Sequence, residues 1–129
     1  MENNYKKQNH EKMIVWQMAD RVDYAVQNIL KKVPFREFSM RRQIDSASDS
    51  IGSNFIEGYY SNSTKEFLRF CRYARRSAGE LQERLRRVLR KGFITVKEYE
   101  DAADIVIKTG YLLDRLMLAL MNYRKNEKM

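Results

Sequence analysis

The sequence is poor in the residues that interrupt helices. Only one of its 129 residues is proline and only five are glycine. Because these two residues mark most turns, the composition indicates few turns and therefore long helices. Hydrophobic residues make up 43% of the chain and charged residues 33%, which is typical of a globular protein rather than a disordered one. A chain of this length usually forms one domain, so we expect residues 1–129 to fold as a single domain.

Cysteine and histidine are equally scarce. Cys71 is the single cysteine, which excludes an intramolecular disulfide framework, and His10 is the single histidine. Two such residues are too few for a zinc site, and His10 lies in the polar N-terminal segment, away from any partner for acid–base or nucleophilic catalysis. No glycine-rich phosphate loop follows a strand pattern. We therefore predict no metal, no cofactor and no enzymatic activity.

Long apolar runs are also missing. The longest, residues 116–121, is far shorter than the roughly 20 residues that a membrane span requires. Residues 1–12 are polar and lack the apolar core of a secretory signal. We expect a cytoplasmic protein without a membrane partner.

What the sequence does contain is helical periodicity. Apolar residues recur at intervals of three and four in four segments, which predicts helices at residues 11–32, 39–60, 64–91 and 96–124 with polar ends before His10 and after Tyr123. Pro34 follows the first helix, and Gly92 follows the third in the position where a left-handed residue often ends a helix. The pattern predicts an all-α four-helix bundle.

The helix starts carry signals of their own. Ser63 with Glu66, and Thr95 with Glu98, have the form of capping boxes at the starts of the third and fourth helices.

Two of these helices have unusual faces. The second is rich in serine, alanine and glycine between residues 46 and 53, which favours close packing against a neighbouring helix. The fourth has two adjacent apolar seams, together wider than a surface helix needs to face its own core. Because large exposed apolar patches usually mark association, the extra seam predicts a homo-oligomer. The two seams are Tyr99, Ala103, Val106, Gly110, Leu113, Met117 and Leu120, and Ala102, Ile105, Leu112, Leu116, Ala119 and Tyr123.

Charge is concentrated on the third helix. The chain has a net charge of +8, and residues 64–91 hold ten basic and three acidic side chains, a net of +7. At helical spacing, six basic residues lie opposite the apolar seam, where they can donate hydrogen bonds to phosphates. The alternative is an ordinary solvated face on which Glu80 and Glu83 pair with nearby arginines. The six residues of this predicted nucleic-acid interface are Lys65, Arg69, Arg72, Arg76, Arg87 and Arg90.

Four sequence segments resemble a known family. Residues 15–19 (VWQMA), 50–58 (SIGSNFIEG), 63–70 (STKEFLRF) and 77–81 (SAGEL) are similar to motifs of the four-helix bundle proteins encoded in large-subunit ribosomal RNA intervening sequences. The resemblance implies an antiparallel up-down-up-down bundle, often assembled as a homopentamer. It also implies kinship with the accessory variability determinant proteins of diversity-generating retroelements, which bind a reverse transcriptase and nucleic acid.

The motif residues are Asn54, Glu57, Gly58 and Glu66. We interpret Asn54 and Glu57 as buried or half-buried hydrogen-bonding residues that fix helix register.

Two functional hypotheses follow. The first is a non-enzymatic oligomer that binds structured RNA or a ribonucleoprotein, with RNA favoured over DNA, through the basic face of the third helix. The second is a scaffold that docks an acidic protein, such as a reverse transcriptase or a ribosomal partner, on the same face.

Overall fold

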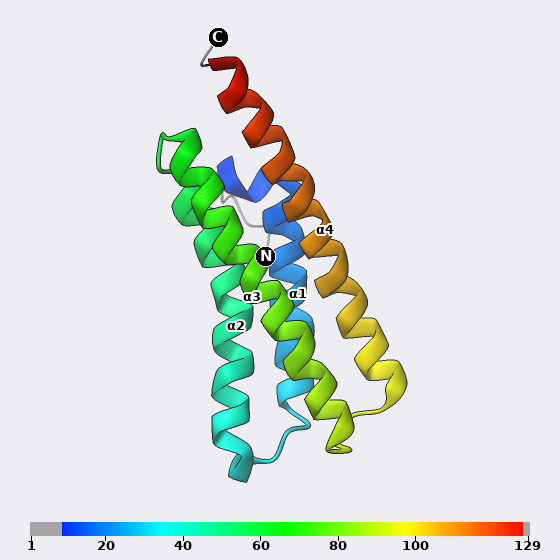
Figure 1. Ribbon diagram of the computed structural model, residues 1–129. Helices are drawn as coiled ribbons and strands as arrows, with labels where there is room; N and C mark the ends of the chain where they lie inside the picture. Colours follow the sequence, from blue (N-terminus) through cyan, green and yellow to red (C-terminus); the bar gives the residue numbers. More distant parts are fainter. Residues whose placement is uncertain (1–8, 128–129) are drawn as a thin grey trace, which may run out of the picture.

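The computed structural model describes residues 9–127 and contains four long α-helices. These are α1 (Ile14–Leu30), α2 (Phe38–Tyr59), α3 (Thr64–Arg90) and α4 (Val96–Glu127), with short 3₁₀ helices η1 (Asn9–Lys12) and η2 (Phe35–Glu37). Short connections join consecutive helices at alternate ends of the bundle (Figure 1). Contacts run between α1 and α2, α2 and α3, α3 and α4, and α4 and α1, so each helix has two neighbours. The prediction of an all-α four-helix protein is confirmed, and no strand occurs in residues 9–127.

One continuous core holds the helices together. Its largest fully buried side chains include Phe55, Ile51, Leu81, Leu85 and Leu113, contributed by α2, α3 and α4. Val22 and Val26 of α1 are also fully buried. Fully burying a side chain of this kind stabilises the fold by roughly 1.5–3 kcal/mol.

Cys71 is part of this core. Its side chain is fully buried, and desolvation raises the pKa of the thiol to about 12. A neutral thiol at this position packs as a small apolar group. Cys71 is therefore a small core residue of α3.

The first helix starts later than expected. Residues 9–12 form the 3₁₀ helix η1, and the extended backbone of Met13 (φ −81°, ψ 132°) separates it from α1. His10 causes the difference, because it is buried between the edges of two aromatic rings, with centroids 5.2 Å from Trp16 and 5.6 Å from Tyr60. Its Nδ1 lies 2.9 Å from the Tyr60 hydroxyl. His10 is therefore an anchor between η1 and the end of α2, not part of a polar end. Of the expected polar residues before it, Asn9 is exposed in η1, and residues 1–8 lie outside the described residues.

The predicted helix ends are largely present. α1 ends at Leu30, two residues earlier than expected, and α3 ends at Arg90, followed by Gly92 with φ +80°. The Gly92 amide donates to the Leu89 carbonyl at 2.9 Å and the Phe93 amide to the Val88 carbonyl at 3.3 Å. This pair of bonds satisfies carbonyls that the helix end would otherwise leave unpaired.

The two capping boxes differ. Thr95 and Glu98 exchange both bonds, since the Glu98 amide donates to Thr95 Oγ1 at 3.1 Å and the Thr95 amide donates to Glu98 Oε1 at 2.9 Å. Ser63 accepts from the Glu66 amide at 3.1 Å, but the Glu66 carboxylate turns to Arg69 instead. A nearby arginine competes for the carboxylate, so only half of the predicted box forms there.

The fourth helix differs from the expected arrangement in two ways. It continues to Glu127 instead of ending at Arg124, and its C-terminal part extends past the other helices (Figure 1). Leu112 and Leu116 of the second seam pack against the bundle core, so much of that seam is covered within one chain. Exposed apolar residues lie instead on a third face, at Ile107, Tyr111 and Leu118, and at the projecting end. No helix in the described part of the chain has the length and apolarity to cross a bilayer.

Candidate nucleic-acid interface

The six basic residues predicted from the sequence share one surface of α3. The same helix buries Leu68, Cys71, Ala74 and Leu81 on the opposite side, so the fold orients the six outward. We call this surface the outer basic face. All six of its residues are exposed: Lys65, Arg69, Arg72, Arg76, Arg87 and Arg90.

The outer basic face is poorly neutralised by the protein itself. Apart from Arg69, none of its six residues forms a hydrogen bond or an ion pair with another residue in the range 9–127. Exposed cations without a partner are available to neutralise the phosphates of a nucleic acid. Neutralisation releases the counterions that are condensed on the nucleic acid, and this release favours binding.

The basic residues beside this face behave differently. Arg75 pairs with Asp114 at 3.0 Å, and Arg84 donates to Gln43 at 2.8 Å. Arg86 pairs with Glu83 at 2.5 Å, and its hydrogen bonds lower the pKa of that carboxyl. These flanking residues are held against neighbours on the protein, as is Lys91, which pairs with Glu37 at 3.0 Å. Among the basic residues in the range 64–91, those without a hydrogen-bonding or ionic partner therefore all belong to the outer basic face.

Aromatic rings adjoin the N-terminal end of the outer basic face. The Arg69 guanidinium lies 4.8 Å from the Phe70 ring centroid and donates to the Tyr73 hydroxyl at 3.2 Å. Hydrogen bonds to Glu66 and Tyr73 raise the pKa of Arg69, which keeps it charged. The Arg76 guanidinium lies 5.6 Å from the Tyr73 ring. Phe70 and Tyr73 were not predicted as part of the interface, although their spacing from Arg69 and Arg76 places them within reach on a helix.

Two of the motif residues, Asn54 and Glu57, differ in role. Asn54 donates to the Ser50 carbonyl and to Ser50 Oγ, both at 2.8 Å, and Ser77 of α3 donates to the same Oγ at 2.8 Å. Asn54 is half-buried and supports a polar link between α2 and α3. Glu57 is exposed and forms no hydrogen bond within residues 9–127, so its interpretation as a buried or half-buried hydrogen-bonding residue was wrong. Its position on α2 faces solvent, where a carboxylate needs no partner.

Gly58 has the closest packing of any glycine in the chain. A Cβ at this position would lie 2.9 Å from Phe70 Cβ and 3.1 Å from Phe67 Cα. Only a residue without a side chain lets the backbones of α2 and α3 approach this closely. Gly58 thereby fixes the position of the N-terminal half of α3, including the start of the outer basic face.

The described residues offer no alternative metal centre. No group of three or more histidine, cysteine, aspartate or glutamate residues in the range 9–127 is placed to hold a metal ion. Asp101 and Asp104 on α4 pair with Lys97 at 3.1 Å and Lys108 at 2.9 Å as ordinary surface ion pairs.

Comparison with known proteins identifies the family. The model of the 23S rRNA-intervening sequence protein family matches residues 11–115, from η1 to most of α4. The chain belongs to this family. No curated protein matches the chain.

A solved structure supports the fold of this family member. A protein of unknown function from the S23 ribosomal protein family of Bacteroides thetaiotaomicron superposes with a TM-score of 0.76 at 24% sequence identity. The match covers 81% of this chain and 98% of that one. At this identity the likeness concerns the fold alone.

Proposed function

We propose that this protein is a non-enzymatic, oligomeric, cytoplasmic bundle of antiparallel up-down-up-down helices that binds structured RNA or a ribonucleoprotein through the outer basic face. The observation that carries the proposal is the unpaired charge. Five of the six residues have no hydrogen-bonding or ionic partner among the described residues, while the flanking Arg75, Arg84, Arg86 and Lys91 each have one.

The geometry suits a nucleic-acid backbone. From Lys65 to Arg90 the outer basic face follows α3 for roughly 38 Å, at about 1.5 Å per residue. Arginine presents a planar fork that donates two hydrogen bonds to phosphate oxygens. Such contacts set the position of the backbone and do not read sequence, so we expect binding that tolerates many sequences.

Fluorescence anisotropy with a labelled structured RNA tests this function. We expect binding at about 50 mM salt that weakens steeply by about 200 mM, with log K falling linearly against log salt because counterions are released. Absence of binding at the lower salt concentration would contradict the proposal. Affinity that does not change with salt would exclude a phosphate-led interface.

Oligomerisation is part of the same proposal and rests on α4. Ile107, Tyr111 and Leu118 are 51%, 58% and 57% exposed and lie on one side of the helix. Covering such side chains in a symmetric interface removes apolar surface from water. The family resemblance, which implies a homopentamer, favours five subunits.

Multi-angle light scattering at micromolar concentration measures the assembly. We expect a mass several times the 15.5 kDa of one chain. Leu118→Glu places a charge in the apolar surface and is expected to shift the protein toward monomer, whereas Glu100→Lys, an exposed change in the first turns of α4, is not. A monomeric mass for the unmodified protein refutes this part of the proposal.

The same face is able to dock an acidic protein such as a reverse transcriptase or a ribosomal partner, as in the proposed kinship with the accessory variability determinant proteins. Nuclease treatment separates the two possibilities. A complex isolated from the native cytosol that survives nuclease, together with no binding to purified RNA, would favour the protein partner and overturn RNA binding.

A further inference from the structure

A separate cavity lies beside the C-terminal end of the outer basic face. It has a volume of about 180 Å³ and lies between the start of α2 and the end of α3. Three of its lining residues are basic, Arg84, Arg87 and Lys91, and one is acidic, Glu37. Its lining therefore carries a net charge of +2.

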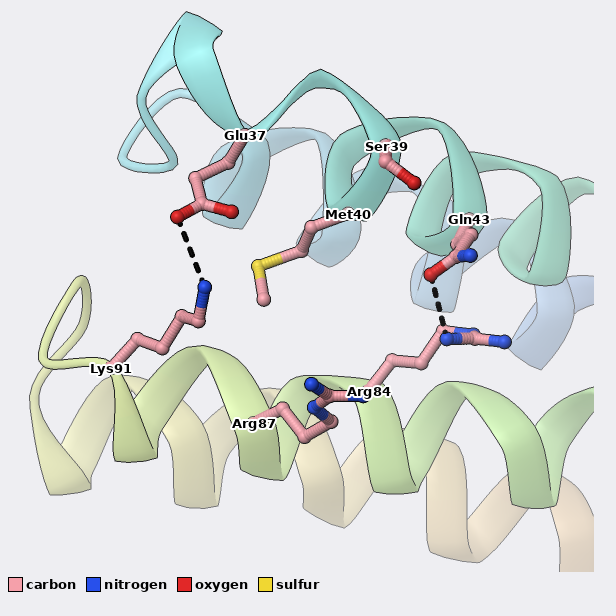
Figure 2. A pocket seen from close by; sticks show the side chains of 7 residues that line it. All are labelled: Glu37, Ser39, Met40, Gln43, Arg84, Arg87 and Lys91. Carbon is pink, nitrogen blue, oxygen red and sulfur yellow. Dashed lines mark hydrogen bonds and ion pairs between the residues drawn. The ribbon is translucent and has the colours of Figure 1, made fainter.

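The basic side chains are arranged around one space. Lys91 is held at one end by Glu37, with Nζ 3.0 Å from Oε1, and Arg84 is held at the other by Gln43 at 2.8 Å (Figure 2). Arg87 lies between them and has no hydrogen-bonding partner within residues 9–127 (Figure 2). Met40 supplies an apolar wall. Arg84 and Lys91 are already held in place by their partners. An anion that enters the cavity therefore mainly has to order the side chain of Arg87, which keeps the entropic cost of binding low.

We propose that this cavity binds a terminal phosphate group of a nucleic-acid strand. The inference rests on the proposed function, because the strand would lie along the outer basic face. Arg87 belongs to both the face and the cavity, so a strand that follows the face would bring its end to the cavity.

The charge and the donors fit this ligand. A terminal phosphate carries about −1.5 to −2 at neutral pH, which balances the net +2 of the cavity, whereas an internal phosphodiester carries only −1. Its three terminal oxygens match two guanidinium forks and one ammonium group, and the Ser39 hydroxyl, also without a partner among the described residues, adds a donor. The cavity lies at the first turn of α2, the positive end of that helix dipole.

The test compares RNA oligonucleotides of one sequence that carry a 5′-phosphate, a 3′-phosphate or hydroxyl groups at both ends. We expect at least one phosphorylated end to bind about tenfold more tightly than the hydroxyl form, the size of effect typical of added charge-assisted hydrogen bonds. In the R84Q/K91Q variant, neither of whose residues belongs to the outer basic face, this advantage should fall to within about twofold. The control K108Q/R115Q loses the same charge from α4 and should keep the advantage.

The outcomes separate the two proposals. Equal binding of all three oligonucleotides to the unmodified protein overturns the phosphate cavity and leaves RNA binding intact. An advantage that survives in R84Q/K91Q, or that K108Q/R115Q also abolishes, overturns it as well, because the effect would not originate in the cavity. No binding of any oligonucleotide overturns the proposed function and this inference with it.

A parallel experiment with small molecules distinguishes a phosphate at the end of a nucleic acid from a free phosphate compound. Inorganic phosphate and a nucleoside monophosphate are titrated against the thermal transition of the protein at constant ionic strength. One combination of results would assign the cavity to a free phosphate compound and overturn the nucleic-acid proposal. In that case the small molecule raises the transition temperature of the unmodified protein but not that of R84Q/K91Q, and RNA with phosphorylated ends binds no more tightly than RNA without them.

Discussion

Replacement of Arg69, Arg72 and Arg76 by glutamate is expected to weaken RNA binding by at least about a hundredfold at 50 mM salt. The three side chains occupy consecutive turns of the outer basic face, and all are exposed. Each reversal removes a cation and adds an anion close to the phosphates. Because three cations no longer neutralise phosphates, the slope of log K against log salt should become shallower by about 2 where the contacted RNA is single-stranded and by about 3 where it is a duplex.

A matched control keeps the total charge the same. Reversal of Lys97, Lys108 and Arg115 changes the net charge by the same amount, but these residues are exposed on α4. The control is expected to weaken binding only slightly and to retain the original salt slope. Equal losses in both variants would show that net charge, and not the outer basic face, governs the interaction. Circular dichroism of each variant checks that its helices are retained.

The second large effect concerns stability. Gly58→Ala is expected to lower the free energy of unfolding by about 2 kcal/mol, because the added methyl overlaps Phe70 Cβ and the backbone of Phe67. Alanine favours a helix by about 1 kcal/mol over glycine, which offsets only part of the clash. Urea denaturation measures the change.

Gly52 provides the control within the same helix. A Cβ there would meet only Ala19 Cβ at 3.9 Å, an ordinary contact. Gly52→Ala should therefore raise the free energy of unfolding by up to about 1 kcal/mol. The variants are compared at one protein concentration, since oligomers gain apparent stability with concentration. Equal effects of the two substitutions would contradict close packing at Gly58.

Most of the fold was predictable because local signals agree with one another. The apolar stripe of α3, the cap at Ser63 and the left-handed Gly92 all define the same helix, and Thr95 with Glu98 defines the start of α4. The start of α1 was not predictable. The apolar spacing predicted a helix from residue 11, but contacts of His10 with Trp16 and Tyr60 hold residues 9–12 in a 3₁₀ turn.

The candidate site was also only partly predictable from the sequence. Helical spacing placed the six basic residues on one face, but it gave no information about which basic side chains would find partners. Arg84 meets Gln43 across 41 positions of sequence, and Lys91 meets Glu37 across 54. The cavity therefore depends on contacts between α2 and α3 that no local pattern contains.

The seven units of net positive charge on residues 64–91 and the long-helix composition follow from the sequence alone, because both depend only on residue type and spacing. Tertiary structure decided which of those charges remain unpaired, that Glu57 faces solvent, and that much of the second seam of α4 is covered within one chain. Pairing, burial and cavities arise from the approach of distant segments, and only the folded chain brings those segments together.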